Sequence, residues 1–121
     1  MAKKILITGA EGQLGQALQT ILADHYTVLP TTRKPAEIIF KYRNVVEMDI
    51  ANLDSVSNTI NSFHPDIIIN CAAYSDVDGN EINKKLSHQV NVEGLSNLLQ
   101  ASDKDIYIIQ ISSDYVFDCA N

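Results

Sequence analysis

The sequence predicts an α/β protein built on a doubly wound parallel sheet with strand order 3-2-1-4-5. Short apolar, β-branched segments alternate along the chain with segments of helical periodicity, and a glycine-rich turn separates the first such pair. The 121 residues have the length of a single domain. Because crossovers between parallel strands are right-handed, this alternation places the helices on both faces of one sheet. The order reverses between the first and fourth strands, where such sheets bind their ligands.

The first two elements are the most clearly marked. Residues 4–8 (KILIT) are short, apolar and β-branched, and they stop at Gly9, which is typical of a buried strand. A helix is expected from Gln13, with its apolar residues at helical spacing forming one inward face. These residues are Leu14, Ala17, Leu18, Ile21 and Leu22.

The next elements are expected from similar patterns. Residues 27–30 and 44–48 form short strands, and Asn52 is placed to cap a helix. The inner face of that helix is expected to consist of Leu53, Val56, Ile60 and Phe63.

The last elements follow a break at Pro65-Asp66. Residues 67–69 are all isoleucine, as expected of a parallel strand covered on both faces. A longer helix follows, ending near 102–103, and residues 106–111 form the fifth strand. Inward positions on this helix are expected at Leu86, Val90, Gly94 or Leu95, and Leu98.

Composition excludes several classes of protein. Fifteen acidic against nine basic residues give a net charge of −6, which argues against binding to a nucleic-acid backbone. No stretch approaches the length of a membrane span. Cys71 and Cys119 form no CxxC pair, and the three histidines lack metal-ligand spacing. We therefore expect a cytoplasmic protein that binds neither nucleic acid nor membrane. No pattern in its residues predicts a metal site.

The turn at residues 8–15 (TGAEGQLG) has the G-x-x-G-x-x-G pattern of a dinucleotide-binding loop in a Rossmann fold. Gly9 would permit the sharp turn, Gly12 would let the backbone approach a pyrophosphate, and Gly15 would let the helix pack against the sheet. The start of the helix would supply amide groups to the anion. The alternative is a tight turn with no ligand. The expected cofactor loop comprises Gly9, Glu11, Gly12, Gln13, Leu14 and Gly15.

The end of the second strand favours NADP(H) over NAD(H). A carboxylate at this position would accept a hydrogen bond from the ribose 2′-hydroxyl of NAD(H) and repel the 2′-phosphate of NADP(H). The residues here are Thr31-Thr32-Arg33-Lys34, which include no acid. Arg33 could bind a phosphate, or it could belong to an ordinary solvated basic pair. After the third strand, Asp49 and Ile50 would lie beside the adenine. Alternatively, Asp49 could have no ligand and simply begin the turn that leads to Asn52.

The ends of the fourth and fifth strands carry the remaining candidates. Ala72, Ala73 and Tyr74 include small residues where backbone would pass close to the cofactor, although small residues also suit a crowded strand end. Ser113 would bring a hydroxyl to the mouth of the cleft, where it could stabilise negative charge developing on a substrate carbonyl oxygen. The alternative is that Ser112-Ser113-Asp114 only forms a turn.

Taken together, these segments resemble the cofactor half of an extended short-chain dehydrogenase/reductase, and within that superfamily the dTDP-4-dehydrorhamnose reductase family. The resemblance covers essentially all 121 residues and rests on TGAEGQLG (8–15), MDI (48–50), PDIIINCAAYSDVD (65–78), VNVEG (90–94) and QISSDYVFD (110–118). It implies reduction of the 4-keto group of dTDP-4-dehydrorhamnose by NADPH or NADH. It also implies that residues 1–121 form an NAD(P)-binding Rossmann domain without the sugar-binding region.

The resemblance assigns roles to individual residues. Gly12, Gln13 and Leu14 would hold the pyrophosphate, and Thr32 and Arg33 would lie near the adenosine ribose. The adenine would lie against Asp49 and Ile50, and the nicotinamide side would be lined by Ala72, Ala73 and Tyr74. Asn91 matches a helix asparagine that organises the active site, although spacing alone fits an exposed polar position equally well. Ser113 matches the catalytic Ser/Thr, and Asp114 a substrate contact.

The sequence also departs from the family pattern. The family's proton donor is a Tyr-x-x-x-Lys pair, and none of the five tyrosines here has a lysine four residues later. We therefore expect the 121-residue chain to be inactive by itself. Mg²⁺ is implied by the resemblance alone, and Ala17 stands where family members often have an acid. A metal-bridged dimer is therefore in doubt.

Two functions remain open. The chain would supply the cofactor-binding half of a nucleotide-sugar reductase, or it would be a non-catalytic module similar to the regulatory subunit of methionine adenosyltransferase. In either case the sheet would stop at the apolar fifth strand, and such edges recruit partners. We therefore expect a homodimer or another association through this edge.

Overall fold

The computed structural model describes residues 3–10, 12–33, 45–71 and 81–111, with side chains from residue 91 onward in the last segment. Its described elements are β1 (Lys4–Thr8), α1 (Gln13–Leu22), β2 (Thr27–Thr32), β3 (Val46–Glu47), α3 (Leu53–Phe63), β4 (Ile67–Asn70), α4 (Glu81–Ala101) and β5 (Tyr107–Gln110). They alternate between strand and helix from β1 to β2 and again from β3 to β5.

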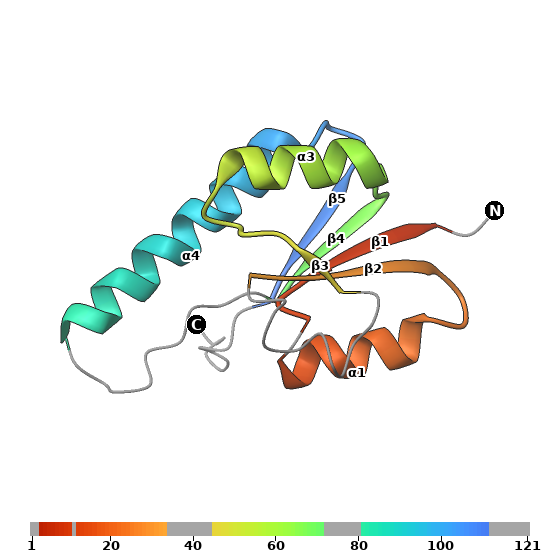
Figure 1. The fold of residues 1–121 in the computed structure, drawn as a ribbon, viewed down its shortest axis with the longest axis horizontal. Helices are drawn as coiled ribbons and strands as arrows, with labels where there is room; N and C mark the ends of the chain where they lie inside the picture. The colour runs from red at the N-terminus through yellow and green to blue at the C-terminus, as the bar shows by residue number, and fades with distance from the viewer. Residues whose placement is uncertain (1–2, 11, 34–44, 72–80, 112–121) are drawn as a thin grey trace, which may run out of the picture.

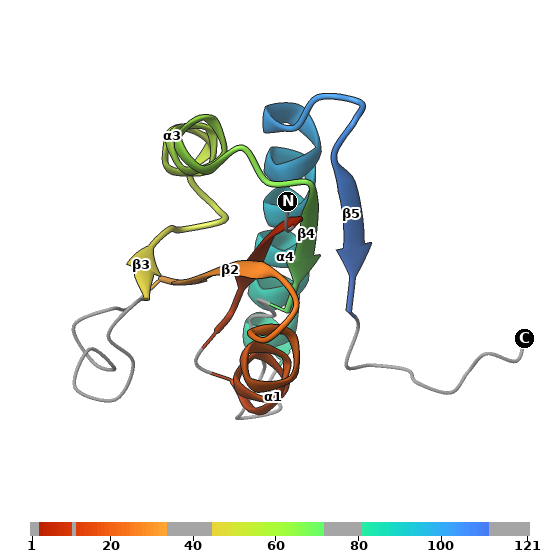
Figure 2. The same cartoon turned by 90° about the vertical axis from the view of Figure 1, so that its right-hand side faces the viewer.

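The strands form one parallel sheet with the order β3-β2-β1-β4-β5, which confirms the predicted topology. Figure 1 shows α3 and α4 on one face of this sheet and α1 on the other, and Figure 2 shows the same layers from the side. The central strand β1 pairs with β2 and β4, so that the chain reverses its winding direction between β1 and β4. The predicted binding edge is therefore present.

The core has two parts, one on each face of the sheet. Beneath α3 and α4, Leu6 and Ile68 of the central strands pack with helix residues such as Val56 and Leu98. On the other face, Ile5, Ile7 and Ile69 pack against the inner side of α1. Alternate residues of β1 and β4 thus enter opposite cores, which explains why these strands are apolar throughout.

The predicted inner face of α1 is partly wrong. Leu18 and Leu22 pack against the sheet and Gly15 is buried, but Leu14, Ala17 and Ile21 are exposed. The five apolar residues of this helix cover more than one stripe, so hydrophobic spacing alone does not decide which side faces inward. The buried glycine decides it, because only a residue without a side chain allows the helix to approach the loop at residues 9–10.

The other boundaries differ in small ways. Asn52 caps α3 as predicted, its side-chain oxygen accepting from Ser55 N at 3.1 Å, but Leu53 in the first turn is 39% exposed. β2 continues past Pro30, since Thr31 and Thr32 pair with β3. β3 is only two residues long, and residue 44 lies outside the described residues. Leu86 and Val90 lie in the part of α4 whose side chains are not described, whereas Gly94 and Leu98 point inward as expected.

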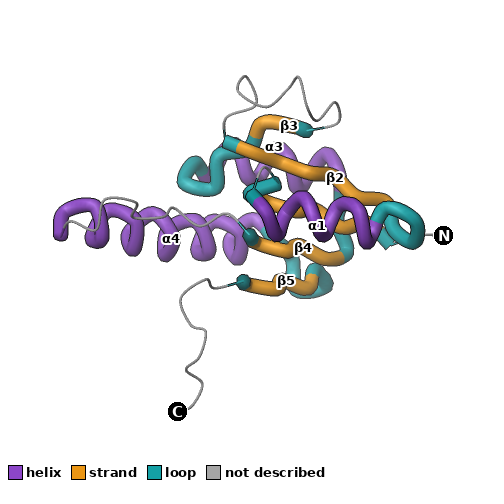
Figure 3. Tube along the Cα trace, turned by 90° about the horizontal axis from the view of Figure 1, so that it is seen from below, coloured by secondary structure: helices purple, strands orange, loops and turns teal. Residues whose placement is uncertain are grey.

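Within the described segments, no helix has the length and apolar character needed to cross a membrane. Figure 3, which shows the molecule from below, shows that the amino-terminal part of α4 extends past the ends of the strands.

Candidate functional site

The glycine-rich loop joins the end of β1 to α1 at the edge where the winding reverses. Gly9 has a φ of 64°, a conformation that residues with a side chain rarely adopt, so its predicted role in the sharp turn is confirmed. The turn is closed by Gly12 N, which donates to Gly9 O at 3.1 Å. Ala10 N donates to Thr31 O at 3.0 Å, which ties the loop to β2.

Gly12 and Gly15 lack side chains for different reasons. A Cβ atom on Gly15 would lie 2.5 Å from Gly9 O and 2.8 Å from Ala10 Cα, so packing of the helix against the loop requires glycine there. A Cβ on Gly12 would meet only Gly9 O, at an ordinary 3.6 Å, and its backbone is in an extended conformation open to any residue. Among the residues that the structure describes, no neighbour requires glycine at position 12. The open space beside it fits the approach of a ligand.

The amino terminus of α1 is suited to an anion. Gly12 is the N-cap residue, no side chain caps the helix, and its first turn contains no acidic residue. The first hydrogen bond from the helix runs from Gln16 N to Gly12 O at 2.9 Å, so the amides of Gln13 and Leu14 precede the helical ladder. Their side chains are exposed. These amides and the helix dipole together favour a phosphate at this position.

At the end of β2, the two predicted ribose residues have different environments. Thr32 is only 1% exposed, and its carbonyl accepts from Met48 N at 2.9 Å. Arg33, directly after the strand, is exposed. Of the pair, Arg33 is therefore the residue whose side chain is at the surface of the binding edge. Thr31 is also buried and donates through Oγ1 to Ile7 O at 2.9 Å, which supports the strand end from within.

The turn after β3 holds Asp49 and Ile50 firmly. The Asp49 carboxylate accepts from Ala51 N at 3.0 Å, and Asp49 N donates to Ser55 Oγ at 3.1 Å. Asp49 thus forms the turn that leads into α3, the alternative role left open by the sequence. Ile50 is 7% exposed and packs against Gly94 of α4. Contact of either residue with an adenine stays a prediction.

A line of polar side chains crosses the carboxyl ends of β1, β4 and β5. Thr8 Oγ1 donates to Asn70 Oδ1, and Asn70 Nδ2 donates to Gln110 Oε1 at 2.7 Å. Thr8 and Asn70 are each 1% exposed. Cys71 follows β4 directly, its amide donating to Thr8 O at 3.3 Å, and burial raises the pKa of its thiol. These bonds fix the relative positions of the strand ends below the glycine loop.

Several predicted site residues lie outside the described residues. Asn91 is described and lies half-buried on α4, one turn before Gly94. The structure therefore brings the glycine loop, Arg33 and the turn at Asp49 to one edge of the sheet and leaves the catalytic assignments as predictions. The residues not described are Glu11, Ala72, Ala73, Tyr74, Ser113 and Asp114.

Two residues that support this edge were missed by the sequence reasoning. Gln19 on α1 donates through Nε2 to Ala10 O at 3.0 Å and to Gly15 O at 3.2 Å, which holds the loop against its helix. Asn97 on α4 donates through Nδ2 to Ile50 O at 2.8 Å. The only local signal was a polar residue on the inner side of each helix.

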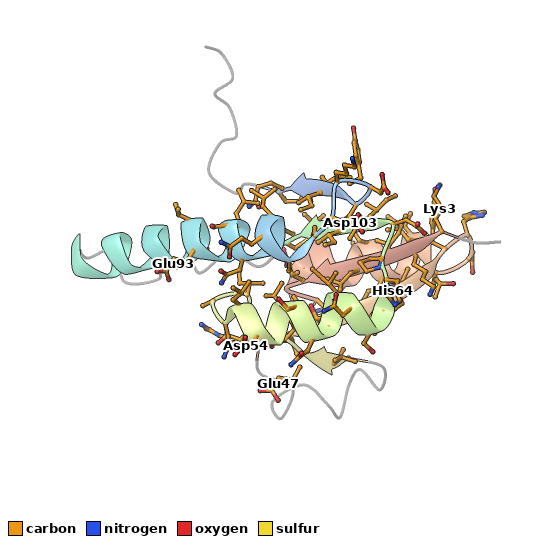
Figure 4. The ribbon with its side chains drawn as sticks, turned by 90° about the horizontal axis from the view of Figure 1, so that it is seen from above. Lys3, Glu47, Asp54, His64, Glu93 and Asp103 are labelled. Carbon is orange, nitrogen blue, oxygen red and sulfur yellow. The ribbon has the colours of Figure 1, made fainter. Side chains whose placement is uncertain are left out.

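Charged residues of the described segments lie at both ends of the sheet. Glu47, Asp54 and Glu93 lie toward the carboxyl ends of the strands, whereas Lys3, His64 and Asp103 lie toward the opposite end (Figure 4). Within the described residues, no His, Cys, Asp and Glu side chains gather in a group of three or more that could hold a metal ion. Arg33 lies exposed directly after β2, and its guanidinium would attract a ligand phosphate at this edge.

Comparison with known families and relatives gives a consistent result. The family model described as RmlD substrate binding domain matches residues 3–121. The dTDP-4-dehydrorhamnose reductase of Aggregatibacter actinomycetemcomitans is 40% identical over 118 residues, which cover 95% of this chain and 36% of that protein. Methionine adenosyltransferase 2 subunit beta of Pongo abelii is 31% identical over 121 residues, or 98% of this chain and 35% of that protein. The chain thus spans little more than a third of the relatives it matches.

A solved structure agrees with the sequence relatives. The dTDP-4-dehydrorhamnose reductase of Bacillus anthracis, in complex with NADP, superposes with a TM-score of 0.76 at 35% identity. The match covers 97% of this chain and 38% of that one. The likeness therefore extends over the whole sheet and the glycine loop.

Proposed function

This chain belongs to the RmlD substrate binding domain family, and on that premise we propose that it supplies the NADP(H)-binding part of a nucleotide-sugar reductase. The substrate would be dTDP-4-dehydrorhamnose, whose 4-keto carbon accepts a hydride while its oxygen accepts a proton, giving dTDP-rhamnose. The proposal rests on the relatives of that name and on the NADP complex of one of them. We place the reaction in the cytoplasm.

The observation that carries the proposal is the open space beside Gly12. The described residues leave room for a side chain there, which supports a ligand that approaches the backbone closely as the reason for the glycine. The amides of Gln13 and Leu14 would bind the pyrophosphate, and Arg33 would bind a phosphate on the adenosine ribose. When bound, the reduced nicotinamide supplies the hydride.

The catalytic side of the proposal depends on residues outside those described. Ser113 would donate a hydrogen bond to the 4-keto oxygen, and Asp114 would contact the sugar. The 121-residue sequence contains no Tyr-x-x-x-Lys pair, so we propose that this chain alone binds the cofactor without turning over substrate.

The cofactor part is tested by calorimetric titration with NADPH of the unmodified chain and of Gly12→Ala. Because the added Cβ fits the chain but occupies the ligand's space, we expect at least a roughly tenfold loss of affinity with an unchanged melting temperature. Gly15→Ala should instead lower the melting temperature, since its Cβ would meet backbone atoms. Thr20→Ala, exposed on the same helix, is the control. Equal NADPH affinity in Gly12→Ala and the unmodified chain would refute the proposal.

A second candidate is a regulatory module like the methionine adenosyltransferase subunit, favoured by the match that covers 98% of this chain. Both candidates bind a dinucleotide, so the titration does not separate them. Sequencing the coding DNA beyond the codon for Asn121 does. A Tyr-x-x-x-Lys pair encoded shortly downstream favours the reductase, and its absence favours the module.

A further inference from the structure

The side chain of Gln19 connects α1 to the glycine-rich loop. Its Nε2 donates to Ala10 O at 3.0 Å and to Gly15 O at 3.2 Å, so both N–H groups of the side-chain amide are used. Gly15 lies one turn earlier on the same side of the helix, and its missing side chain lets α1 approach closely enough for Gln19 to reach the loop. The two residues therefore act together at one contact between the helix and Ala10.

The backbone of Ala10 is bonded on both sides. The residue is fully buried, its N–H donates to Thr31 O at 3.0 Å, and its carbonyl accepts from Gln19. A buried carbonyl that loses its donor is costly, so the Gln19 amide supplies a bond that the loop needs in this conformation. Because the atoms facing the Gln19 nitrogen are carbonyl oxygens, a carboxylate or an apolar side chain could not take its place.

The glycine-rich loop is thereby fixed on either side of residue 11. On one side, Ala10 is bonded to β2 and to α1. On the other side, Gly12 N donates to Gly9 O at 3.1 Å, directly before the helix amides that are expected to bind the pyrophosphate. A loop that is ordered before the ligand arrives loses less conformational freedom on binding, which strengthens the complex.

We propose that Gln19 is a positioning residue for the dinucleotide, because by holding Ala10 it keeps the loop in the shape that receives a pyrophosphate. The inference rests on the proposed function, since it requires that this loop binds the cofactor. It assigns no contact with the ligand to Gln19 itself. Loss of the side-chain amide should therefore weaken ligands that carry a pyrophosphate and spare ligands without one. A side chain that only stabilises the fold would change neither affinity while the protein remains folded.

The test compares NADPH with adenosine 2′-phosphate, which has the adenosine and the ribose phosphate of NADPH but no pyrophosphate. The fluorescence of bound NADPH reports its affinity, and displacement of NADPH gives the affinity of adenosine 2′-phosphate. Gln19→Met keeps the length of the side chain but removes its donor, and we expect it to bind NADPH roughly three- to tenfold more weakly. Adenosine 2′-phosphate should bind this variant within about twofold of its affinity for the unmodified chain.

The matched control is Thr20→Val. Thr20 donates through Oγ1 to Gln16 O at 3.2 Å, so the control removes a bond to a carbonyl one turn earlier on the helix, as Gln19→Met does at Gly15. Thr20 is exposed, and its bond is to the helix rather than to the loop. Both affinities should stay unchanged in this variant. Titrations are made well below each melting temperature, so that a loss of folded protein is not mistaken for a loss of affinity.

Hydrogen exchange measured by NMR tests the inference on the unmodified chain, without any variant. In the absence of ligand, the side-chain amide protons of Gln19 should exchange more slowly than those of Gln13, whose side chain is exposed. Exchange at equal rates would mean that the loop is not held in advance, and it overturns the inference. So does an equal NADPH affinity in Gln19→Met and the unmodified chain, or an equal loss for both ligands. An unmodified chain that binds no NADPH would refute the proposed function, and this inference with it.

Discussion

The side-chain amide of Asn97 on α4 donates a hydrogen bond to the main-chain carbonyl of Ile50, in the turn that follows β3. Three residues earlier on the same helix, Gly94 allows the Ile50 side chain to pack directly against the helix backbone. The turn expected to border the adenine is thus held in place by contacts with α4. Its position depends on how α4 docks on the sheet.

Replacing Asn97 with leucine should destabilise the protein. The substitution keeps the side-chain volume but leaves the Ile50 carbonyl without its donor, at a cost of about 1 to 2 kcal/mol in the free energy of unfolding. Urea unfolding followed by circular dichroism measures this cost. Ser96→Ala, at an exposed neighbouring position, is the matched control. If both variants unfold at the same urea concentration, the Asn97 bond does not hold the turn.

Arg33 should determine the preference between the two nicotinamide cofactors. Loss of a charge-assisted hydrogen bond to the ribose phosphate should weaken NADPH binding roughly ten- to a hundredfold in Arg33→Gln, while NADH binding changes little. Fluorescence titration with both cofactors measures the ratio. Lys104→Gln removes the same charge from the turn before β5 and serves as control. An equal loss for NADH and NADPH would show that Arg33 does not recognise the phosphate.

The fold was predictable because its signals are local. A buried parallel strand such as 67–69 and a capping residue such as Asn52 act within a few residues of sequence. The bond between Asn97 and Ile50 joins residues far apart in the chain, so no local pattern contains it. The inner side of α1 was predicted only in part, because apolar residues lie on more than one side of this helix. The close packing of Gly15 against Ala10, which no hydrophobic pattern shows, decides which side faces the sheet.

The buried bond between Thr8 and Asn70 should contribute to stability. Thr8→Val has nearly the same shape, but it removes a donor to Asn70 Oδ1 in a region sealed from water. We expect a loss of roughly 1 to 3 kcal/mol in the free energy of unfolding. Thr20→Val removes a hydroxyl that bonds to Gln16 O on the exposed side of α1, and it should change stability far less. Equal losses in the two variants would contradict a role for the strand-end network.

Cys71 should react slowly with alkylating reagents near neutral pH. The thiol lies at the end of β4 beside the apolar cluster of Ile5, Ile7 and Ile69, and burial raises its pKa because the thiolate loses solvation. Only the thiolate reacts, so the rate of alkylation in the folded chain should rise at higher pH than it does in the unfolded chain.

The measurement uses a Cys119→Ser variant, in which Cys71 is the only thiol. Iodoacetamide labelling is followed by mass spectrometry across a pH series, once in buffer and once in urea. The profile in urea is the internal control, since unfolding restores the ordinary pKa and full access to the same residue. Reduced access alone would lower the alkylation rate of the folded chain by the same factor at every pH. A raised pKa instead shifts the midpoint of the profile upward, and coincident midpoints would show that burial does not affect the ionisation of Cys71.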